Sequence, residues 1–518
     1  MGKLLYTISI KVHKYVGLLI IVYIMYMSIS GILLNHPRLI ADFSAPSTLT
    51  PKSYEIKNWS GGAFRGAVNS VNCPDKIWIY GYNGIWYSAD GGDTFSSFMN
   101  GEFPKSSYGR KVKDLIVFNK NGKEFLLIGT YEGLYLCDIK SEEWMNISPN
   151  SSYEKFVKVY KDKNRLIAIS DSSFYVAGPE WEENLKPKFT NVWVNRDIEQ
   201  SRRSFIHMFL HLHDGSICGF FGKLIVDFTA LIIIFLSLSA IYIWYIPKRW
   251  KKLKKRGKYP HKKEKKHLNF FYKYHLKLGL WTILFSLIIG FTGLILTPPI
   301  IFTFMGKSIK EYKYPSFILA PWKKKIKGGY FDKTTSKLLL SCSDGIWEGD
   351  SGLKKEFKKS KLRVPISGMG ANVFTKDKKG DLVIGSFSGL YGVKKESGSV
   401  YDYMHPDSKL NLNRSRKDRV MVSGFYEAPD GTTIIVSYFK GIIKKCNNSF
   451  LMPKELKKAK RSLWNWLFAL HNGRIWRSLI GKSYLFVTPI GAIFFILVLF
   501  SGLFDYIYRI YRKIKNKK

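Results

Sequence analysis

The chain has few cysteines, only five in 518 residues. They stand far apart, at positions 73, 137, 218, 342 and 446. No C-x-x-C-H motif is present, which excludes a covalently attached c-type haem, so any haem would be bound non-covalently. Cys137 and Cys342 lie in strand-like stretches, where we expect buried thiols rather than a disulfide framework.

Acidic residues are scarce, with 39 Asp and Glu against 82 Lys and Arg, a formal net charge of +43. Such an excess can indicate nucleic-acid binding. We reject nucleic acid as a partner, because about half of the excess flanks apolar segments, where lysine and arginine set membrane orientation. Much of the remainder lies in residues 300–480. It either attracts an anionic substrate or reflects a lysine-rich, solvated surface.

A nucleotide-binding signature is also missing. No G-x-G-x-x-G motif follows a predicted strand and opens a helix, so we expect no flavin- or nicotinamide-binding domain in this chain. Electrons for any redox chemistry must then come from a separate donor, either a reductase or a membrane quinol.

Long apolar segments are present, in contrast. A membrane helix needs about 20 apolar residues. Four segments meet this requirement: 15–34, 224–246, 276–297 and 483–506. Residues 247–274 carry thirteen Lys or Arg and one acid, and the C-terminus is also basic. Short basic flanks stay in the cytoplasm, so both termini and this link are predicted to be cytoplasmic.

The first apolar segment also resembles a secretory signal peptide, because it follows a positively charged start. Its apolar stretch is too long for a typical signal peptide, and no convincing A-x-A cleavage site follows. We therefore expect it to remain as a membrane helix.

The two long segments between the membrane helices, about 37–212 and 300–480, share a β pattern. Six phrases each contain an alternating apolar strand, a turn with Gly or Ser, and a second strand: 77–88, 126–137, 166–177, 338–349, 382–393 and 433–444. Repeats of this kind are typical of propeller blades. Three blades cannot close a ring, and an open sheet leaves exposed edges. We predict one extracytoplasmic β-propeller of about six blades, built jointly by both segments.

One of these repeats carries the phrase SADGGDTF, from Ser88 to Phe95. It matches the Asp-box pattern S-x-D-x-G-x-T-W, with Phe in place of Trp. The pattern marks a hairpin turn in propellers, including sialidases. Because no arginine triad or tyrosine nucleophile can be assigned, we interpret it as a turn without catalytic meaning.

Histidines recur at matching positions of the membrane segments. His13 and His275 each open an apolar segment, and both are followed at the same offsets by Gly (Gly17, Gly279) and by a hydroxyl-Gly pair (Ser30-Gly31, Thr292-Gly293). His213 and His471 precede the other two segments, in the phrases LHDG and LHNG. Haem iron accepts two axial imidazoles, and the macrocycle needs apolar walls. We predict two b-type haems, the inner one on His13 and His275 and the outer one on His213 and His471.

Three other histidines are weaker candidates. His36, at the outer end of the first apolar segment, is a reserve ligand for the outer haem. His207 and His211 have an i, i+4 spacing, so they could bind a metal or a substrate, or simply face solvent on a helix.

These phrases resemble the PepSY-associated transmembrane family. The matching residues lie in the stretches 13–37, 212–228, 274–296 and 470–476. The likeness as a whole extends over about 130 residues, essentially the four membrane helices and their outer ends. The family includes bacterial inner-membrane ferrisiderophore reductases with b-type haems. The resemblance implies an inner-membrane protein that transfers electrons to ferric chelates such as ferric siderophores in the periplasm. Family members often carry PepSY domains between the helices, whereas here the outer segments predict a propeller, so the substrate does not carry over.

The predicted fold class is membrane α plus all-β, a four-helix transmembrane bundle with an outer propeller. The predicted regions are 1–36 (tail and first helix), 37–205 (first propeller segment), 206–246 (second helix and its outer end), 247–274 (basic link), 275–299 (third helix), 300–465 (second propeller segment), 466–507 (fourth helix and its outer end) and 508–518 (basic tail). The leading hypothesis is transmembrane electron transfer through haem, with a membrane oxidoreductase activity.

Two alternatives remain open. A propeller on a four-helix anchor could bind a periplasmic partner protein or regulate transport without being an enzyme, in which case the histidines would be dispensable. A metal-handling protein could use His207, His211 and His213 without haem.

Overall fold

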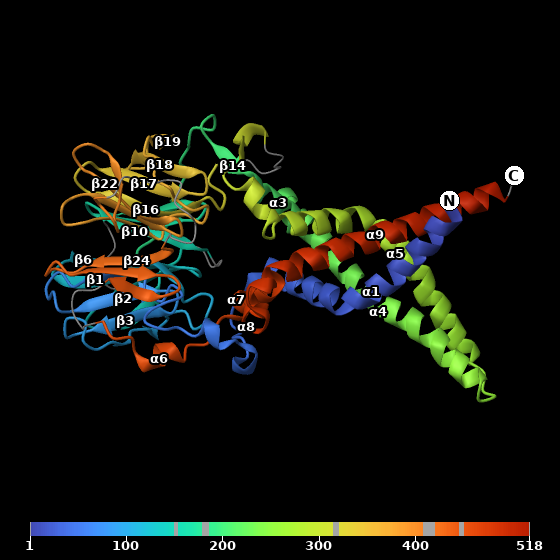
Figure 1. Ribbon diagram of the computed structural model, residues 1–518. Coiled ribbons are helices and arrows are strands. Elements are labelled where there is room, and N and C mark those ends of the chain that lie inside the picture. Colours follow the sequence, from blue (N-terminus) through green and yellow to red (C-terminus); the bar gives the residue numbers. More distant parts are fainter. Residues whose placement is uncertain are drawn as a thin grey trace.

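The computed structural model describes residues 2–149, 154–178, 186–313, 321–407, 420–444 and 450–516. The chain forms a helical bundle with a β domain at one end of it (Figure 1). Cys446 lies outside the described residues, and the other four cysteines form no disulfide with one another.

Four helices are long and apolar enough to cross a membrane. They are α1 (Gly2–Asn35), α4 (Gly219–Lys254), α5 (Lys262–Ile295) and α9 (Tyr484–Lys515). Both α1 and α5 pack extensively against α4 and α9. The helices α1 and α5 therefore occupy one diagonal of a four-helix bundle. The four membrane spans predicted from the sequence are confirmed.

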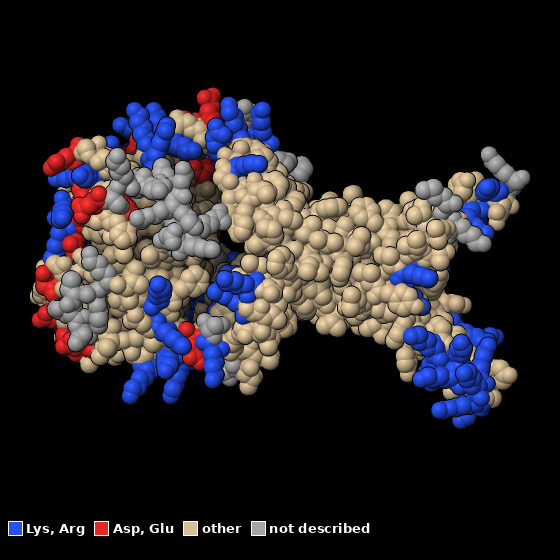
Figure 2. Space-filling view, viewed as in Figure 1, with Lys and Arg blue, Asp and Glu red and all other residues tan. Residues whose placement is uncertain are grey.

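Two of these helices continue beyond the apolar segments. The basic link of residues 247–274 is mostly helical, because α4 runs to Lys254 through Pro247 and α5 begins at Lys262. The link and both chain ends lie at the end of the bundle remote from the β domain (Figure 1). Lys and Arg side chains gather at the tip of the link (Figure 2).

Two short helices join the bundle to the β domain: α3 (Phe205–His213) and α7 (Leu463–His471). Each begins at a serine N-cap, Ser204 or Ser462, whose side chain accepts a hydrogen bond from a backbone N–H in the first turn. Each ends at a histidine, followed two residues later by a glycine with positive φ, Gly215 or Gly473. The remaining short helices are α2 (Pro37–Ile40), α6 (Lys454–Lys457) and α8 (Arg477–Ile480), with 3-10 turns at Ser47–Leu49, Lys52–Tyr54, Ser216–Cys218, Ile300–Phe304, Glu311–Lys313, Arg474–Trp476 and Gly481–Ser483.

The β domain consists of small sheets that are mostly antiparallel. The first outer segment forms β1 (Gly66–Asn69), β2 (Ile77–Gly81), β3 (Gly84–Ser88) and β4 (Ser96–Ser97); β5 (Asn100–Gly101), β6 (Val112–Lys120), β7 (Lys123–Thr130), β8 (Leu134–Asp138) and β9 (Glu143–Asn146); and β10 (Phe156–Asp162), β11 (Arg165–Ser170), β12 (Phe174–Ala177) and β13 (Phe189–Val192). The second forms β16 (Ile326–Asp332), β17 (Lys337–Cys342), β18 (Gly345–Asp350) and β19 (Lys358–Lys359); β20 (Val373–Lys376), β21 (Leu382–Ser386), β22 (Gly389–Val393) and β23 (Val400–Asp402); and β24 (Val422–Glu427), β25 (Thr433–Ser437) and β26 (Gly441–Lys444). The strands β14 (Arg202–Ser204) and β15 (Ser308–Lys310) pair across the two segments.

The six phrases of the sequence are confirmed as antiparallel hairpins: β2–β3, β7–β8, β11–β12, β17–β18, β21–β22 and β25–β26. Neighbouring sheets touch through one edge strand each. These contacts join β1 to β6, β6 to β10, β10 to β16, β16 to β20, β20 to β24, and β24 back to β1.

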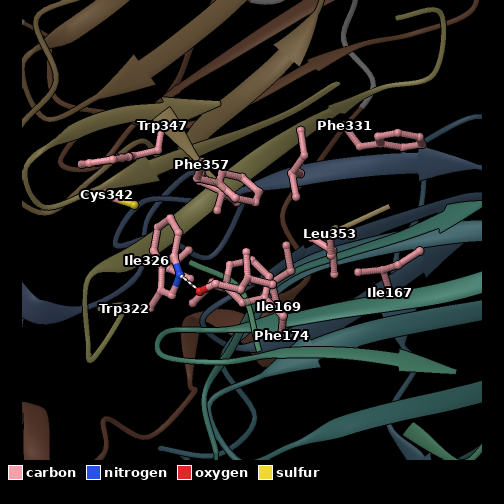
Figure 3. Close-up of a cluster of buried hydrophobic side chains, with 14 of the residues drawn as sticks. Ile167, Ile169, Phe174, Trp322, Ile326, Phe331, Cys342, Trp347, Leu353 and Phe357 are labelled. Atoms are coloured by element: carbon pink, nitrogen blue, oxygen red, sulfur yellow. Dashed lines mark hydrogen bonds between the residues drawn. The ribbon is translucent and has the colours of Figure 1, made fainter. Parts of the chain in front are cut away.

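Apolar clusters pack the two outer segments against each other at both seams. Figure 3 shows one cluster, in which Ile169 and Phe174 of the first segment meet Trp322 and Phe357 of the second. The Trp322 indole N–H donates to the Val194 carbonyl at 2.8 Å. Burying each large apolar side chain stabilises by about 1.5–3 kcal/mol, so both segments contribute to one folded domain.

The SADGGDTF phrase forms a loop after β3 that is closed by its own side chains. The Ser88 hydroxyl donates to Asp90 Oδ1 at 2.6 Å, and the Thr94 hydroxyl donates to Asp90 Oδ2 at 2.6 Å. These hydrogen bonds hold the pKa of Asp90 well below its usual value. The geometry agrees with a structural turn.

Candidate functional site

The first histidine pair lies inside the bundle, toward the end remote from the β domain. His13 of α1 and His275 of α5 come from the two diagonal helices, and their ring centroids are 6.3 Å apart, with the planes at 88°. The equal position of each histidine on its helix therefore brings the two imidazoles together.

Each ring of this inner pair is held through Nδ1. His275 Nδ1 lies 2.8 Å from the Ser239 hydroxyl of α4. His13 Nδ1 lies 3.0 Å from the Val498 carbonyl and 3.3 Å from the Ser501 hydroxyl, both on α9. Each ring is thus oriented by the helix packed beside its own.

The second pair lies at the other end of the bundle, below the β domain. His213 of α3 and His471 of α7 have ring centroids 6.1 Å apart and planes at 68°. His471 Nδ1 lies 2.8 Å from the Ser30 hydroxyl. His213 Nδ1 lies 3.1 Å from both the Ile289 carbonyl and the Thr292 hydroxyl. The repeated hydroxyl residues of the sequence therefore hold the outer histidines.

The hydrogen bonds assign one tautomer to all four rings. His13 and His213 face backbone carbonyls, which only accept, so Nδ1 carries the proton. The Ser239 hydroxyl donates to the Leu236 carbonyl at 2.9 Å, so it accepts from His275. In the same way, the Ser30 hydroxyl donates to the Tyr26 carbonyl at 2.6 Å and accepts from His471. Every Nε2 then has a lone pair available to a metal.

The separation of the rings also fits one metal ion between them. An imidazole nitrogen binds a metal at about 2 Å, and the ring centroid lies about 1 Å further, so two axial rings have centroids about 6 Å apart. The separations of 6.3 and 6.1 Å match this value. Both separations are therefore compatible with one metal ion between the two rings of a pair.

The inner pair borders a cavity of about 560 Å³ between the helices. Its walls are mainly apolar and include Gly17 and Gly279. Each glycine lies four residues after its histidine, on the same helix face. At both positions an added Cβ would lie about 3.9 Å from the nearest atoms, in ordinary van der Waals contact, and a longer side chain would enter the cavity beside the imidazoles. A planar macrocycle needs this space.

The same cavity has basic residues at its rim. Lys14, Lys248 and Arg509 line it together with Asp505. A b-type haem has two carboxylate groups, and cations at the edge of an apolar cavity suit them. The donor set, the cavity walls and the rim are therefore consistent with a haem at the inner pair.

Small residues let the rings approach the helices closely. A Cβ on Gly502 would lie 2.9 Å from His13 Cε1, and one on Gly293 would lie 3.1 Å from His213 Cε1. The corresponding distance from Gly31 to His471 Cε1 is 3.6 Å. Each of these glycines follows the hydroxyl residue that bonds the ring, so the hydroxyl-Gly pairs form seats for the imidazoles.

Burial keeps the outer rings neutral. Burial, together with the neighbouring His213, lowers the pKa of His471 to about 3, and burial also lowers the pKa of His213. Metal binding requires the neutral imidazole. Both outer rings are thus in the ligating form at neutral pH.

His36 has a carboxylate partner. Its Nε2 is 2.6 Å from the Asp227 carboxylate of α4, while the preceding Asn35 bonds the other oxygen of Asp227 at 3.1 Å. The structure thus places the reserve ligand in a polar contact that joins the end of α1 to α4.

His207 and His211 lie on α3 with ring centroids 6.4 Å apart. Burial, followed by nearby cations such as Lys327 for His207, lowers the pKa of His207 to about 4. Burial also lowers the pKa of His211 to about 4. Within the described ranges, no three His, Cys, Asp or Glu side chains gather as a metal site.

Ser239 and Ser501 are not among the residues predicted from the sequence. Both precede a small residue, as Ser239-Ala240 and Ser501-Gly502. The same pattern, a hydroxyl residue followed by a small residue, occurs at Ser30-Gly31 and Thr292-Gly293. This pattern could have identified both serines as candidates.

The model of one protein family, described as the PepSY-associated TM region, matches residues 10–509. No curated protein matches the chain. Similar solved structures include the extracellular domain of a hybrid two-component system from B. thetaiotaomicron (10% identity, TM-score 0.34, 76% of this chain and 39% of that chain). They also include an ancestral GH74 enzyme (9%, 0.33, 75% and 36%) and PorZ of Porphyromonas gingivalis (10%, 0.34, 73% and 38%). The chain therefore spans less than two fifths of the length of these structures.

Proposed function

Because the chain belongs to the PepSY-associated transmembrane family, and because its four paired histidines lie at axial-ligand spacing, we propose that it carries electrons across a membrane through two b-type haems. His13 and His275 would hold the inner haem, and His213 and His471 the outer one. The observation that carries the proposal is the shared geometry of the two pairs, 6.3 and 6.1 Å between centroids with every Nδ1 engaged.

The residues of the chain would fix and tune the cofactors. Bound haem would supply the one-electron chemistry. The hydroxyl and carbonyl partners of Nδ1 orient each imidazole and raise its basicity as a ligand. The apolar walls of the inner cavity exclude water, and the basic rim favours the carboxylates.

The spacing of the two sites suits a path across the bilayer. His13 and Ser30, which belong to the inner and outer sites, are 17 residues apart on α1, and His275 and Thr292 are 17 residues apart on α5. At 1.5 Å per residue this is about 25 Å, most of the roughly 30 Å hydrocarbon core. Two sites at these depths would divide the crossing into shorter electron-transfer steps.

We further propose that the β domain is a six-bladed propeller. The cycle of contacts through β1, β6, β10, β16, β20 and β24 supports this arrangement, as do the apolar clusters at both seams between the segments. Closure would pack the inner strand of each sheet against its neighbours and leave only short outer edges exposed. The two-stranded β14–β15 sheet lies outside the cycle and connects the domain to α3.

The orientation follows from charge. Short flanks rich in Lys and Arg remain cytoplasmic, so the link and both chain ends would lie inside and the β domain outside, in the periplasm of a bacterial inner membrane. Electrons would enter from a separate cytoplasmic reductase or from quinol. The acceptor would be a ferric chelate received beneath the propeller, close to the outer histidines.

The proposal is tested with purified protein in liposomes. We expect a reduced-minus-oxidised spectrum of a b-type haem and reduction of external ferric citrate, measured with a ferrous-specific chelator, when dithionite is trapped inside. His275→Ala should abolish this transfer, whereas His267→Ala, an exposed histidine in the link, should not. Wild-type protein that lacks haem absorption after expression with ample haem would contradict the proposal and favour the non-enzymatic, partner-binding alternative.

A further inference from the structure

A second cavity runs along the axis of the β domain. It has a volume of about 1030 Å³ and is lined by one edge strand of each of the six sheets, namely β1, β6, β10, β16, β20 and β24. At the end where these strands begin, Arg65, Lys113 and Lys327 come from three different sheets, and Lys155 lies beside them at the start of β10. Four cations from four neighbouring sheets thus converge on one place.

Backbone irregularities contribute to this convergence. The pairing of β6 with β7 shifts register between Val112 and Asp114, and the pairing of β16 with β17 shifts between Ile326 and Gly328. The residues within these shifts are Lys113 and Lys327. A β-bulge redirects a side chain out of the regular alternation, so both lysines occupy special positions at equivalent points of two sheets.

These cations have little compensation from carboxylates. In the described portion of the chain, none of the four makes an ion pair with a carboxylate, and Asp114 is already bonded to Lys158 at 2.9 Å. Asp171 is the other acid that faces the cluster. Arg65 is 5% exposed, and its Nε has no hydrogen-bond partner among the described residues. Converging, unpaired cations in a cavity are costly unless an anion joins them.

Tyrosines complete the wall. The Arg65 guanidinium lies over the Tyr82 ring and donates to its hydroxyl at 3.3 Å and to the Asn372 side chain at 3.0 Å. The Lys155 ammonium lies 4.1 Å from the Tyr131 ring centroid. Aromatic faces stabilise cations without using up their hydrogen-bond donors. The lysine ammonium groups and the Arg65 Nε therefore keep donors for a ligand in the axial cavity.

We propose that this end of the axial cavity, at Arg65, Lys113, Lys155 and Lys327, binds a small molecule that carries several carboxylate groups. The assignment goes beyond the proposed electron transfer and does not depend on it, because the site is formed wholly by the β domain. Several separated carboxylates match several separated cations, whereas a single negative charge would satisfy only one of them. A metal chelate of such a ligand would be held on the side of the domain that faces α3.

Protonation should be coupled to binding. Desolvation, together with Arg65, Lys155 and Lys327, lowers the pKa of Lys113 well below its usual value despite the nearby Asp114. Desolvation and Lys155 likewise lower the pKa of Lys327 to about 8, against the opposing effect of Asp171. A bound polyanion stabilises the charged lysines and raises these pKa values, so binding takes up protons and affinity falls as the pH rises above about 8.

The test is calorimetric titration of the detergent-solubilised full chain with citrate as the probe. We expect saturable binding, a loss of affinity of about tenfold or more in Lys113→Met, and recovery in Lys113→Arg. Lys333→Met, an exposed lysine at the far end of the same cavity, should bind like the wild type. Heats measured in HEPES and in Tris should differ by the enthalpy of the protons taken up.

Acetate at the same ionic strength provides the second control, with no saturable binding expected. The proposal would be overturned by absence of citrate binding at millimolar concentration, by equal binding of citrate and acetate, or by unchanged affinity in a Lys113→Met variant that keeps its melting temperature. Haem content should not change in any of these variants, which separates this site from the histidine pairs.

Discussion

The bundle and the β domain are both built from internal repeats, but the repeats keep different residues. In the bundle, the two halves share polar positions: a histidine, a hydroxyl partner and a small residue recur at equal offsets. In the β domain, the six hairpins share apolar alternation and turn glycines, whereas the residues within the register shifts vary: Lys113 and Lys327 in β6 and β16, but Val157 and Ser423 in β10 and β24. Repeated polar residues thus mark a shared chemical task, and repeated apolar residues mark packing.

The largest effect is expected from filling the inner cavity. Gly17→Leu inserts a side chain next to His13 and should exclude the inner haem, so that one of the two haems is lost while the outer one remains. Haem per chain measures this. Val22→Leu, at a position that is 72% exposed on the same helix, should retain both haems. Full haem content in Gly17→Leu would show that the cavity does not hold the cofactor.

In the β domain, the largest effect is expected on stability, from the loss of a buried charge. Arg196 is 2% exposed, lies 3.3 Å from Asp344 and has its guanidinium 4.6 Å from the Trp347 ring centroid. Arg196→Ala leaves Asp344 without its buried partner and should cost about 3–5 kcal/mol. Thermal unfolding of the full chain measures the loss, with exposed Arg202→Ala as the control. If haem content falls in proportion to the loss of thermal stability, haem binding in the bundle depends on the packing of the β domain. The contrast between polar repeats in the bundle and apolar repeats in the β domain would then not hold.

The hydroxyl partners should show a graded effect within the bundle. Ser239→Ala removes the hydroxyl that holds His275 Nδ1, whereas Ser501→Ala leaves His13 its bond to the Val498 carbonyl. We expect a loss of haem affinity of about 10–100-fold for Ser239→Ala and a smaller one for Ser501→Ala.

The matched control for both variants is Thr229→Ala, which removes another buried hydroxyl of α4. It should leave haem affinity unchanged, because Thr229 bonds only the backbone of its own helix at Ile225. Equal effects of all three variants on haem affinity would show that the Ser239 and Ser501 hydroxyls have only a structural role and do not act by orienting the imidazoles.

The smallest effect is expected at the SADGGDTF loop. Asp90→Ala removes its bonds to Ser88 and Thr94 and should destabilise the β domain by about 1 kcal/mol. A lowered melting temperature with unchanged haem and unchanged ferric reduction would agree with a turn. The neighbouring, exposed Asp93→Ala provides the comparison. Loss of reductase activity in Asp90→Ala alone would instead assign the loop a functional role.

Much of this organisation could be predicted from the sequence because it is local. The four membrane spans, the six hairpins and the four paired histidines all depend on short patterns of apolar, turn and histidine residues. The residues that hold the histidines were not predicted: Ser30 and Thr292 stand in a visible repeat with His13 and His275, but their hydroxyls lie against His471 and His213 of the other pair.

The rest depends on which elements become neighbours. Ser239 and Ser501 acquire their role because α4 packs against α5 and α9 against α1. His36 meets Asp227 for a similar reason, through the packing of α1 against α4. The axial lysines converge because sheets distant in sequence surround one cavity. No local pattern in the sequence specifies such pairings.

The central claim is that each histidine pair holds one iron, and haem counts in two double variants test it most directly. His13→Ala with His275→Ala removes both ligands of the same haem, so the account predicts that the outer haem remains. His13→Ala with His213→Ala removes one ligand from each haem, and both haems should be lost. Retention of one haem in the second variant, or loss of both in the first, would contradict the pairing.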